Sequence, residues 1–194
     1  MLATTNGLQL ITPPASEPLT LTEAKAHLRV DGTDEDTLIT ALIIAARQYV
    51  EERCWIALIT QTWQLSLETW PDEALRLPKT PLLSQPTITA VRYLDTDGNQ
   101  QTLSSSVYTV LATGEFTLAY GEEWPDVWPQ WPIELEYTVG YGATSDVPAL
   151  LKATIKLVLG HLFENREAVV AASGISAVSL PLAVDSLLAL YEVR

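Results

Sequence analysis

Cysteine and histidine, two residue types often used as nucleophile and general base, are few in this chain. Its one cysteine is Cys54, and its two histidines are His27 and His161, each inside a segment of helical periodicity. A catalytic serine or cysteine needs a base close by, and no Ser–His or Cys–His pair can be assigned from these positions. The sequence also lacks the H-E-x-x-H, paired C-x-x-C, G-x-S-x-G and G-x-x-x-x-G-K-[ST] motifs. No enzymatic activity and no cofactor are therefore predicted, and Cys54 is expected to be a packed thiol.

One acidic segment has the alternation of a calcium-binding loop. Asp95, Asp97 and Asn99 occupy its first positions, but the bidentate glutamate needed at position 12 is replaced by Ser106. Asp97 is followed by glycine, and Asp-Gly favours a tight turn between antiparallel strands. A hairpin turn is the preferred interpretation.

A second acidic segment consists of Asp34, Glu35 and Asp36. Three carboxylates in a row could hold a cation, but they precede a predicted helix, where the helix dipole already favours negative charge. No metal site is assigned to them.

Tryptophans recur in the segment Trp-Pro-Asp-Val-Trp-Pro-Gln-Trp-Pro, at Trp124, Trp128 and Trp131. Flat indole rings stack on sugar faces, so a carbohydrate-binding β module with helical flanks is the alternative function. Prolines at this spacing can equally build a rigid loop whose rings pack on a sheet. The sequence leaves both interpretations open.

Composition limits the class of protein. The 194 residues are 47% hydrophobic, enough for one sizeable core or two small ones. Aspartate and glutamate number 24 against 11 lysines and arginines, and the net charge of −13 argues against binding of nucleic acid by surface attraction. A single cysteine, no signal peptide and no apolar run of about 18 residues favour a soluble protein made in the cytoplasm, with no membrane partner.

Two helices are predicted near the N-terminus, after an extended, proline-containing arm over residues 1–19. Thr20 and Glu23 form a capping box that begins a short helix. A second cap at Thr33 begins a longer helix that ends near Cys54.

The longer helix carries two adjacent apolar stripes, and so should be buried on two sides. One stripe contains Leu38, Leu42, Ala45 and Tyr49, and the other contains Ile39, Ile43, Ala46 and Val50. The helix is either a central helix of its own core or one whose stripe meets another subunit. In the second case Ile39, Ile43 and Val50 are the candidate contact residues.

From Gln61 the apolar period changes to two, which is typical of half-buried strands. The strands are expected to pair in antiparallel fashion and to cover residues 61–67, 75–77, 87–94, 101–103, 107–111, 116–120 and 133–139.

The helical period returns after Tyr141, with a helix predicted from Pro148 to about Asn165. Residues 168–179 are rich in small side chains and indicate a loop. A final short helix is predicted from Pro181, with apolar residues that dock either on the protein's own core or into a partner. Those residues are Pro181, Leu182, Val184, Leu187, Leu188 and Tyr191.

The fold class predicted is α+β, a helical body with an inserted antiparallel β region. The expected boundaries are an N-terminal arm at 1–19, N-terminal helices at 20–58, the β insertion at 59–142 and C-terminal helices with a tail at 143–194. Together they form one unit.

The order of short motifs supports a family assignment that no single motif carries. The N-terminal motifs are Ile11-Thr12-Pro13-Pro14, the segment EPLTLTEAKAHLRV at 17–30, Asp34-Glu35-Asp36 and AARQYVE at 45–51. The later ones are Gln61-Thr62-Trp63, Trp70-Pro71, Leu77-Pro78, Pro81-Leu82, Tyr93 with Asp97-Gly98, Gly140-Tyr141-Gly142, Val147-Pro148 and HLFENRE at 161–167. In this order they resemble the phage head-tail connector (adaptor) proteins of the gp6-like and phiE125 gp8 family.

The resemblance implies a structural virion protein made in the bacterial host cytoplasm. Such an adaptor forms a homo-oligomeric ring, typically of about twelve copies, beneath the portal protein. It receives a head-completion (stopper) or tail-terminator protein below, and double-stranded DNA passes through the channel without sequence-specific binding. The C-terminal segment commonly reaches the portal in this family. We further expect acids to line the channel and repel DNA phosphates, with Asp34, Glu35 and Asp36 as candidates.

Overall fold

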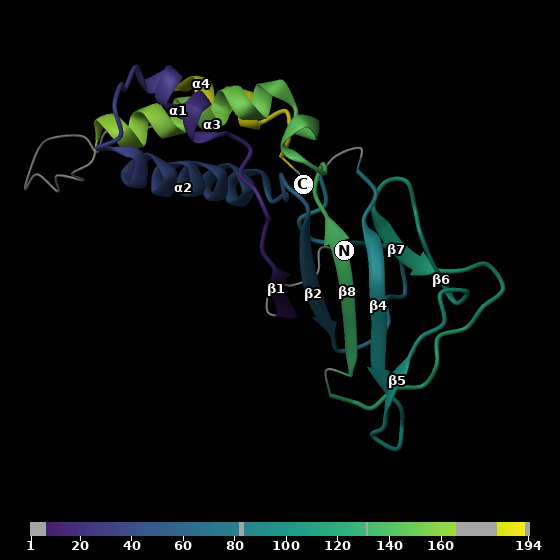
Figure 1. Ribbon diagram of the computed structural model, residues 1–194. Coiled ribbons are helices and arrows are strands. Elements are labelled where there is room, and N and C mark those ends of the chain that lie inside the picture. The colour runs from purple at the N-terminus through teal and green to yellow at the C-terminus, as the bar shows by residue number, and fades with distance from the viewer. Residues whose placement is uncertain (1–6, 82–83, 131, 166–181, 193–194) are drawn as a thin grey trace, which may run out of the picture.

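The computed structural model describes residues 7–81, 84–130, 132–165 and 182–192. Helices gather at one end of the molecule and strands at the other (Figure 1). The helices are α1 (Leu21–Leu28), α2 (Asp36–Cys54), α3 (Ala149–Glu164) and α4 (Leu182–Leu188), with a 3-10 turn, η2, at Thr144–Asp146. The predicted α+β class is confirmed. The loop expected at 168–179, together with Trp131 and Pro181, lies outside the described residues.

The N-terminal helices begin in different ways. At α1 the Thr20 hydroxyl accepts the Glu23 N–H at 3.2 Å, and the Glu23 carboxylate accepts the Thr20 N–H at 2.9 Å, which confirms the capping box. The side-chain cap predicted at Thr33 is wrong: α2 has Glu35 at its N-cap position and no side-chain cap hydrogen bond. Instead, Lys25 of α1 binds the Asp36 carboxylate at 2.5 Å, so an ion pair holds this end of α2.

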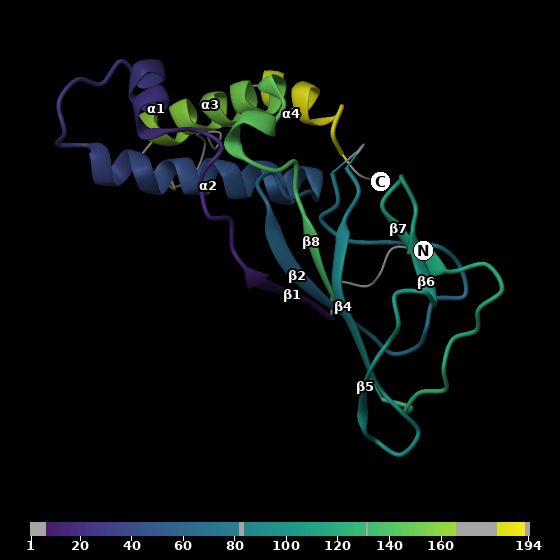
Figure 2. The same cartoon turned by 45° about the vertical axis from the view of Figure 1, so that its right-hand side comes forward.

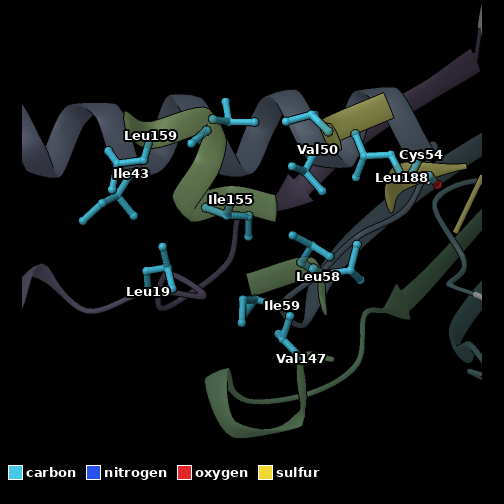
Figure 3. Close-up of a cluster of buried hydrophobic side chains, with 14 of the residues drawn as sticks. Leu19, Ile43, Val50, Cys54, Leu58, Ile59, Val147, Ile155, Leu159 and Leu188 are labelled. Carbon is cyan, nitrogen blue, oxygen red and sulfur yellow. Dashed lines mark hydrogen bonds between the residues drawn. The ribbon is translucent and has the colours of Figure 1, made fainter. Parts of the chain in front are cut away.

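The helices enclose one apolar core, in which α2 lies along α3 (Figure 3). Ile43 and Val50 of α2 face Ile155 and Leu159 of α3, all of them almost inaccessible to solvent. Leu188 of α4 closes the core beside the C-terminal end of α2. The stripe of Ile39, Ile43, Ala46 and Val50 is therefore buried inside this chain. Leu42 and Tyr49 of the other stripe pack against the same core, whereas Ala45 is exposed.

The strands pair in antiparallel fashion, as predicted, and they form two sheets. The larger has the order β1-β2-β8-β4-β5 and the smaller the order β3-β7-β6. Their bounds are β1 Leu8–Thr12, β2 Gln61–Leu67, β3 Leu75–Arg76, β4 Thr87–Leu94, β5 Gln100–Thr102, β6 Tyr108–Val110, β7 Glu115–Leu118 and β8 Ile133–Val139.

A second apolar core lies between the two sheets, because alternate residues of the central strand β8 point into it. Leu135 of β8 pairs with Leu65 of β2 and Val91 of β4, and all three are buried with Phe116 of β7. Figure 2 shows β6 and β7 of the small sheet beside β4 of the large sheet and separate from it.

The N-terminal arm is extended as predicted over the described residues, and part of it joins the large sheet, a pairing that was not predicted. Leu8 pairs with Leu65 and Leu10 pairs with Trp63, which makes β1 an edge strand of the sheet. The alternation of Leu8 and Leu10 with polar neighbours gives this short segment one face that fits beside β2. The β region thus includes residues far before 59–142.

Candidate functional site

The thiol of Cys54 has the surroundings of a structural group. Cys54 is 1% exposed, and its sulfur lies 3.8 Å from the Leu188 carbonyl oxygen. Burial raises the pKa of the thiol to about 11, which keeps it protonated and unreactive at neutral pH. His27 is exposed on α1 and His161 is half-buried on α3. The packed-thiol prediction is confirmed.

In the acidic hairpin, the Asp95 carboxylate stabilises the turn by accepting backbone hydrogen bonds. Asp95 accepts the N–H groups of Asp97 at 3.0 Å and Asn99 at 2.9 Å, and Gly98 has φ +81°, as a tight turn requires. Hydrogen bonds, led by that from the Gln101 amide, lower the pKa of Asp95. The hairpin interpretation is confirmed. In the part of the chain that the structure describes, no group of three or more His, Cys, Asp or Glu is placed to hold a metal ion.

Two Trp-Pro dipeptides, Trp70-Pro71 and Trp124-Pro125, pack against each other beside the second core and form reciprocal hydrogen bonds. The Trp70 and Trp124 rings stack with centroids 4.6 Å apart and planes 5° apart. The Trp70 indole donates to the Pro125 carbonyl at 2.8 Å, and the Trp124 indole donates to the Pro71 carbonyl at 3.3 Å. The Trp124 ring is thereby occupied in packing and is not free to stack on a sugar. Of the other two tryptophans in this segment, Trp128 is 42% exposed and Trp131 is not described.

A buried ion network ties the N-terminal arm to α2. Arg47, 7% exposed, donates to Glu17 at 2.7 Å and to Glu51, one turn further along α2, at 2.5 Å. Glu17 lies in the arm between β1 and α1, so this network fixes how the chain passes from sheet to helices.

The same network continues from α2 into the sheet. The second carboxylate oxygen of Glu51 accepts the Leu58 N–H at 2.8 Å and the Gln61 side-chain amide at 2.7 Å. Burial raises the pKa of Glu51, while the Leu58 N–H and the charge of Arg47 oppose that rise. Three segments, the arm, α2 and the start of β2, therefore share one set of charge-assisted hydrogen bonds.

Lys79 makes a second buried junction, which nothing in the sequence indicated. Its side chain is 3% exposed, and its ammonium group lies 2.6 Å from the Glu52 carboxylate and 4.0 Å from the centre of the Trp55 ring. The Trp63 ring of β2 lies 5.7 Å away on the same ammonium. The Lys79 carbonyl accepts the Ala57 N–H at 2.8 Å. This lysine joins the end of α2 to the sheet through a charge, two aromatic rings and the backbone.

The structure places most of the expected contact residues inside the chain's own helical core. Five of them, Ile39, Ile43, Val50, Val184 and Leu188, are at most 3% exposed. Their burial accounts for the apolar stripes of α2 and α4 without a second subunit.

The remaining expected contact residues lie in α4 or close to its two ends. Leu187 and Tyr191 are half-buried, Pro181 lies outside the described residues, and Leu182 begins α4. Leu190, two residues past the helix, is 66% exposed, the one large apolar side chain that is exposed among the described residues of this segment.

The three acids expected to face a channel have different surroundings. Asp34 is exposed, whereas Glu35 and Asp36 are half-buried and Asp36 pairs with Lys25. Most of the negative charge lies elsewhere: residues 61–146 contain 12 acids and 3 bases, a net charge of −9. The β region is therefore the main source of the chain's acidic field.

In the described residues, no helix is long and apolar enough to cross a membrane.

Comparisons with known proteins agree with this architecture. Three solved structures contain chains of similar fold, and each match covers 96% of this chain and 96% of the matched chain. They are "Neck of empty GTA particle computed with C6 symmetry" (TM-score 0.77, 24% identity), "Virion of native gene transfer agent (GTA) particle" (TM-score 0.75, 24% identity) and "Neck of native GTA particle computed with C12 symmetry" (TM-score 0.74, 23% identity). At this identity they show a shared fold. No curated protein matches the chain. A family model described as "Phage gp6-like head-tail connector protein" matches residues 18–114, half of the chain. The chain therefore belongs to the phage gp6-like head-tail connector family.

Proposed function

We propose that this protein is a non-enzymatic adaptor that forms a ring of about twelve copies beneath the portal, joins the capsid to the tail and continues the DNA channel. The match of residues 18–114 to the head-tail connector family carries the proposal. The symmetric necks that contain chains of the same fold support a ring in the virion. The packed Cys54 and the aspartate turn at 95–99 leave two of the chain's reactive-group candidates with structural roles.

The junction between the helices and the sheet suits a subunit that transmits force between capsid and tail. Arg47 links the arm to α2 through largely buried charge pairs, and the buried Lys79 links the end of α2 to the sheet by pairing with the exposed Glu52. Buried, fully paired charges fix one geometry because any other arrangement strands a charge away from water. A rigid subunit of this kind keeps its two ends in register when the ring is loaded.

Charge in the β region suits passage of DNA without adhesion. The three bases of residues 61–146 are all engaged: Arg76 with the Thr113 carbonyl, Lys79 with Glu52, and Arg92 with Glu136. Unpaired acids therefore dominate the field there, and they repel phosphates.

Asp34, Glu35 and Asp36 remain proposed channel residues. Their replacement together by Asn, Gln and Asn should slow DNA ejection or increase retained DNA in particles carrying the variant. Unchanged ejection would remove these three from the channel lining. Replacement of the exposed pair Asp72 and Glu73 by Asn and Gln, in the same assay, tests separately whether acids of the β region contribute to the repulsion.

The C-terminal segment is the proposed contact with the portal, and the head-completion (stopper) or tail-terminator protein is the proposed partner on the opposite side. Truncation at Pro181 would remove the buried Val184 and Leu188 and would damage the core. Leu190→Asp is a cleaner test because this side chain is 66% exposed. The variant should stay folded and bind the portal at least about tenfold more weakly; equal binding would exclude Leu190 from the contact.

The ring itself is tested by negative-stain electron microscopy of the purified protein, alone and with the portal of its parent phage. The proposal expects rings with a central channel, free in solution or seated on the portal. Monomers that leave the portal bare would overturn it. Binding of glycans, detected as a change in tryptophan fluorescence, would instead favour the carbohydrate-binding alternative.

A further inference from the structure

Three of the large apolar side chains that the structure leaves exposed lie on two neighbouring elements. Leu10 is 40% exposed and Ile11 is 42% exposed on β1, and Ile44 is 37% exposed on α2. Single exposed apolar residues are common on protein surfaces, but three of them on two elements linked through the arm suggest a contact surface.

The surfaces of α2 and β1 that carry these residues face the same space. Ile44, Arg47 and Glu51 lie along one stripe of α2, since they are spaced by three and four residues. Arg47 binds Glu17 of the arm and Glu51 binds Gln61 of β2, so this stripe points toward the arm and the sheet. Both ribbon views show β1 below α2, with the arm rising from β1 past the helix (Figures 1 and 2). We call this surface, formed by residues 8–12 and the exposed side of 37–48, the α2–β1 corner.

A β-bulge turns one apolar side chain out of the sheet at this corner. Leu10 pairs with Trp63 and Thr12 with Thr62, which leaves Ile11 as the extra residue of β1. Bulges at sheet edges end regular pairing and re-aim a side chain. The corner thus offers side-chain contact rather than a straight edge for another strand.

The α2–β1 corner is neutral in a strongly acidic protein. Residues 7–16 contain no charged side chain, and residues 37–48 contain only Arg47, which is buried and paired. The other exposed residues of this side of α2 are small or uncharged: Thr37, Thr40, Ala41, Ala45 and Gln48.

We propose that the α2–β1 corner is the surface on which a second copy of this chain packs in the ring, an inference that rests on the proposed function. Two copies, each with a net charge of −13, repel one another over most of their surfaces. Close contact between two copies is favourable at the α2–β1 corner, because the corner brings no charge into the interface and buries apolar area. DNA does not fit this surface, because the corner presents no accessible cation to a phosphate.

A ring requires a heterologous interface, in which the corner of one copy receives a different surface of the next. Each contact between neighbouring subunits therefore contains one corner, so a substitution at the corner weakens every contact in the ring. Ile44→Asp and Leu10→Asp place a charge in the contact at positions that are more than one third exposed, so we expect the isolated fold to tolerate them. Thr22→Asp, at an exposed position of α1, adds the same charge away from the corner and is the matched control.

Sedimentation velocity across a concentration series and negative-stain microscopy on the portal measure ring assembly for all four proteins. Circular dichroism and thermal unfolding verify that each is folded. We expect Ile44→Asp and Leu10→Asp to raise the concentration needed for assembly by at least about tenfold, and Thr22→Asp to behave as the wild type. If the corner variants assemble as the wild type does, the corner is not the contact, while the proposed ring stands. If the wild type forms no ring, even on the portal, the proposed function fails and the corner loses its role with it.

Discussion

Replacement of Arg47 by methionine tests the buried junction most sharply. Methionine keeps much of the side-chain volume but removes both ion pairs, so Glu51, 6% exposed, is left as a buried charge without its cation. Loss of one partner of a buried pair typically costs about 3–5 kcal/mol. The Leu58 N–H and the Gln61 amide still bind Glu51, which places the expected loss near the lower end, about 3 kcal/mol.

The loss in free energy of unfolding caused by Arg47→Met should also depend on pH, which gives a second test with the same variant. Burial already raises the pKa of Glu51, and removal of the Arg47 charge raises it further. The folded variant then holds a proton on Glu51 at a pH where the unfolded chain has released it. Stability relative to the wild type therefore recovers as pH falls from 8 toward 5, because a neutral carboxyl tolerates burial.

Urea unfolding followed by far-ultraviolet circular dichroism at pH 8 and pH 5.5 measures both effects. Arg53→Met is the matched control, since Arg53 lies on the same helix but is 43% exposed, and its pairs with Asp185 and Glu192 should contribute less than about 1 kcal/mol. A second change, Glu51→Gln in the Arg47→Met background, should restore part of the stability by removing the stranded charge. A loss below about 1 kcal/mol for Arg47→Met, or one that is the same at both pH values, would refute the reasoning.

Three further predictions concern the two cores. Cys54 should not react with a thiol reagent at pH 8 until the protein unfolds, and rapid labelling of the native protein would contradict its burial. Because folding raises the pKa of Cys54 from 9.0 to about 11, its contribution to the free energy of unfolding should be present below pH 9 and fall toward pH 11. Urea titrations at several pH values measure this change. Leu188→Ala should lower the free energy of unfolding by about 2–5 kcal/mol, measured by urea denaturation, since its side chain is fully buried; a change under about 1 kcal/mol would mean that α4 is not part of the core. Trp124→Ala should cost about 2–3 kcal/mol through loss of the Trp70 stack and one hydrogen bond, whereas Trp124→Phe should retain most of the ring contact; equal losses would show that the stack contributes nothing.

Periodicity predicted the elements that bury one face. The strands at 61–67, 87–94 and 133–139 have the bounds that alternation gave, and α3 begins and ends within a residue of the prediction. The Thr20–Glu23 capping box and the turn at Asp95 were predictable for the same reason, since each depends on residues that are close in sequence.

Features that depend on residues distant in sequence were not predictable. Lys79 reads as an ordinary surface lysine until folding places it between Glu52 and the rings of Trp55 and Trp63. The cap at Thr33 failed because the ion pair between Lys25 and Asp36, across two helices, holds the start of α2 instead.

The candidate contact residues illustrate the same limit. An apolar stripe predicts burial but does not identify what covers it, and Ile43 and Leu188 are covered by this chain's own helices. The sequence did not predict an exposed apolar surface at Leu10 and Ile11, because pairing of the arm with β2 is what brings β1 below α2.

The central claim is that this chain forms the connecting ring of a phage neck. Cryo-electron microscopy of purified particles of the parent phage, reconstructed at the neck without imposed symmetry, tests it most directly. We expect a ring directly beneath the portal whose subunits fit the described fold, with neighbours meeting at the α2–β1 corner and the DNA channel continuing through the centre. A neck whose rings cannot hold this fold, in particles that lack the chain, would contradict it.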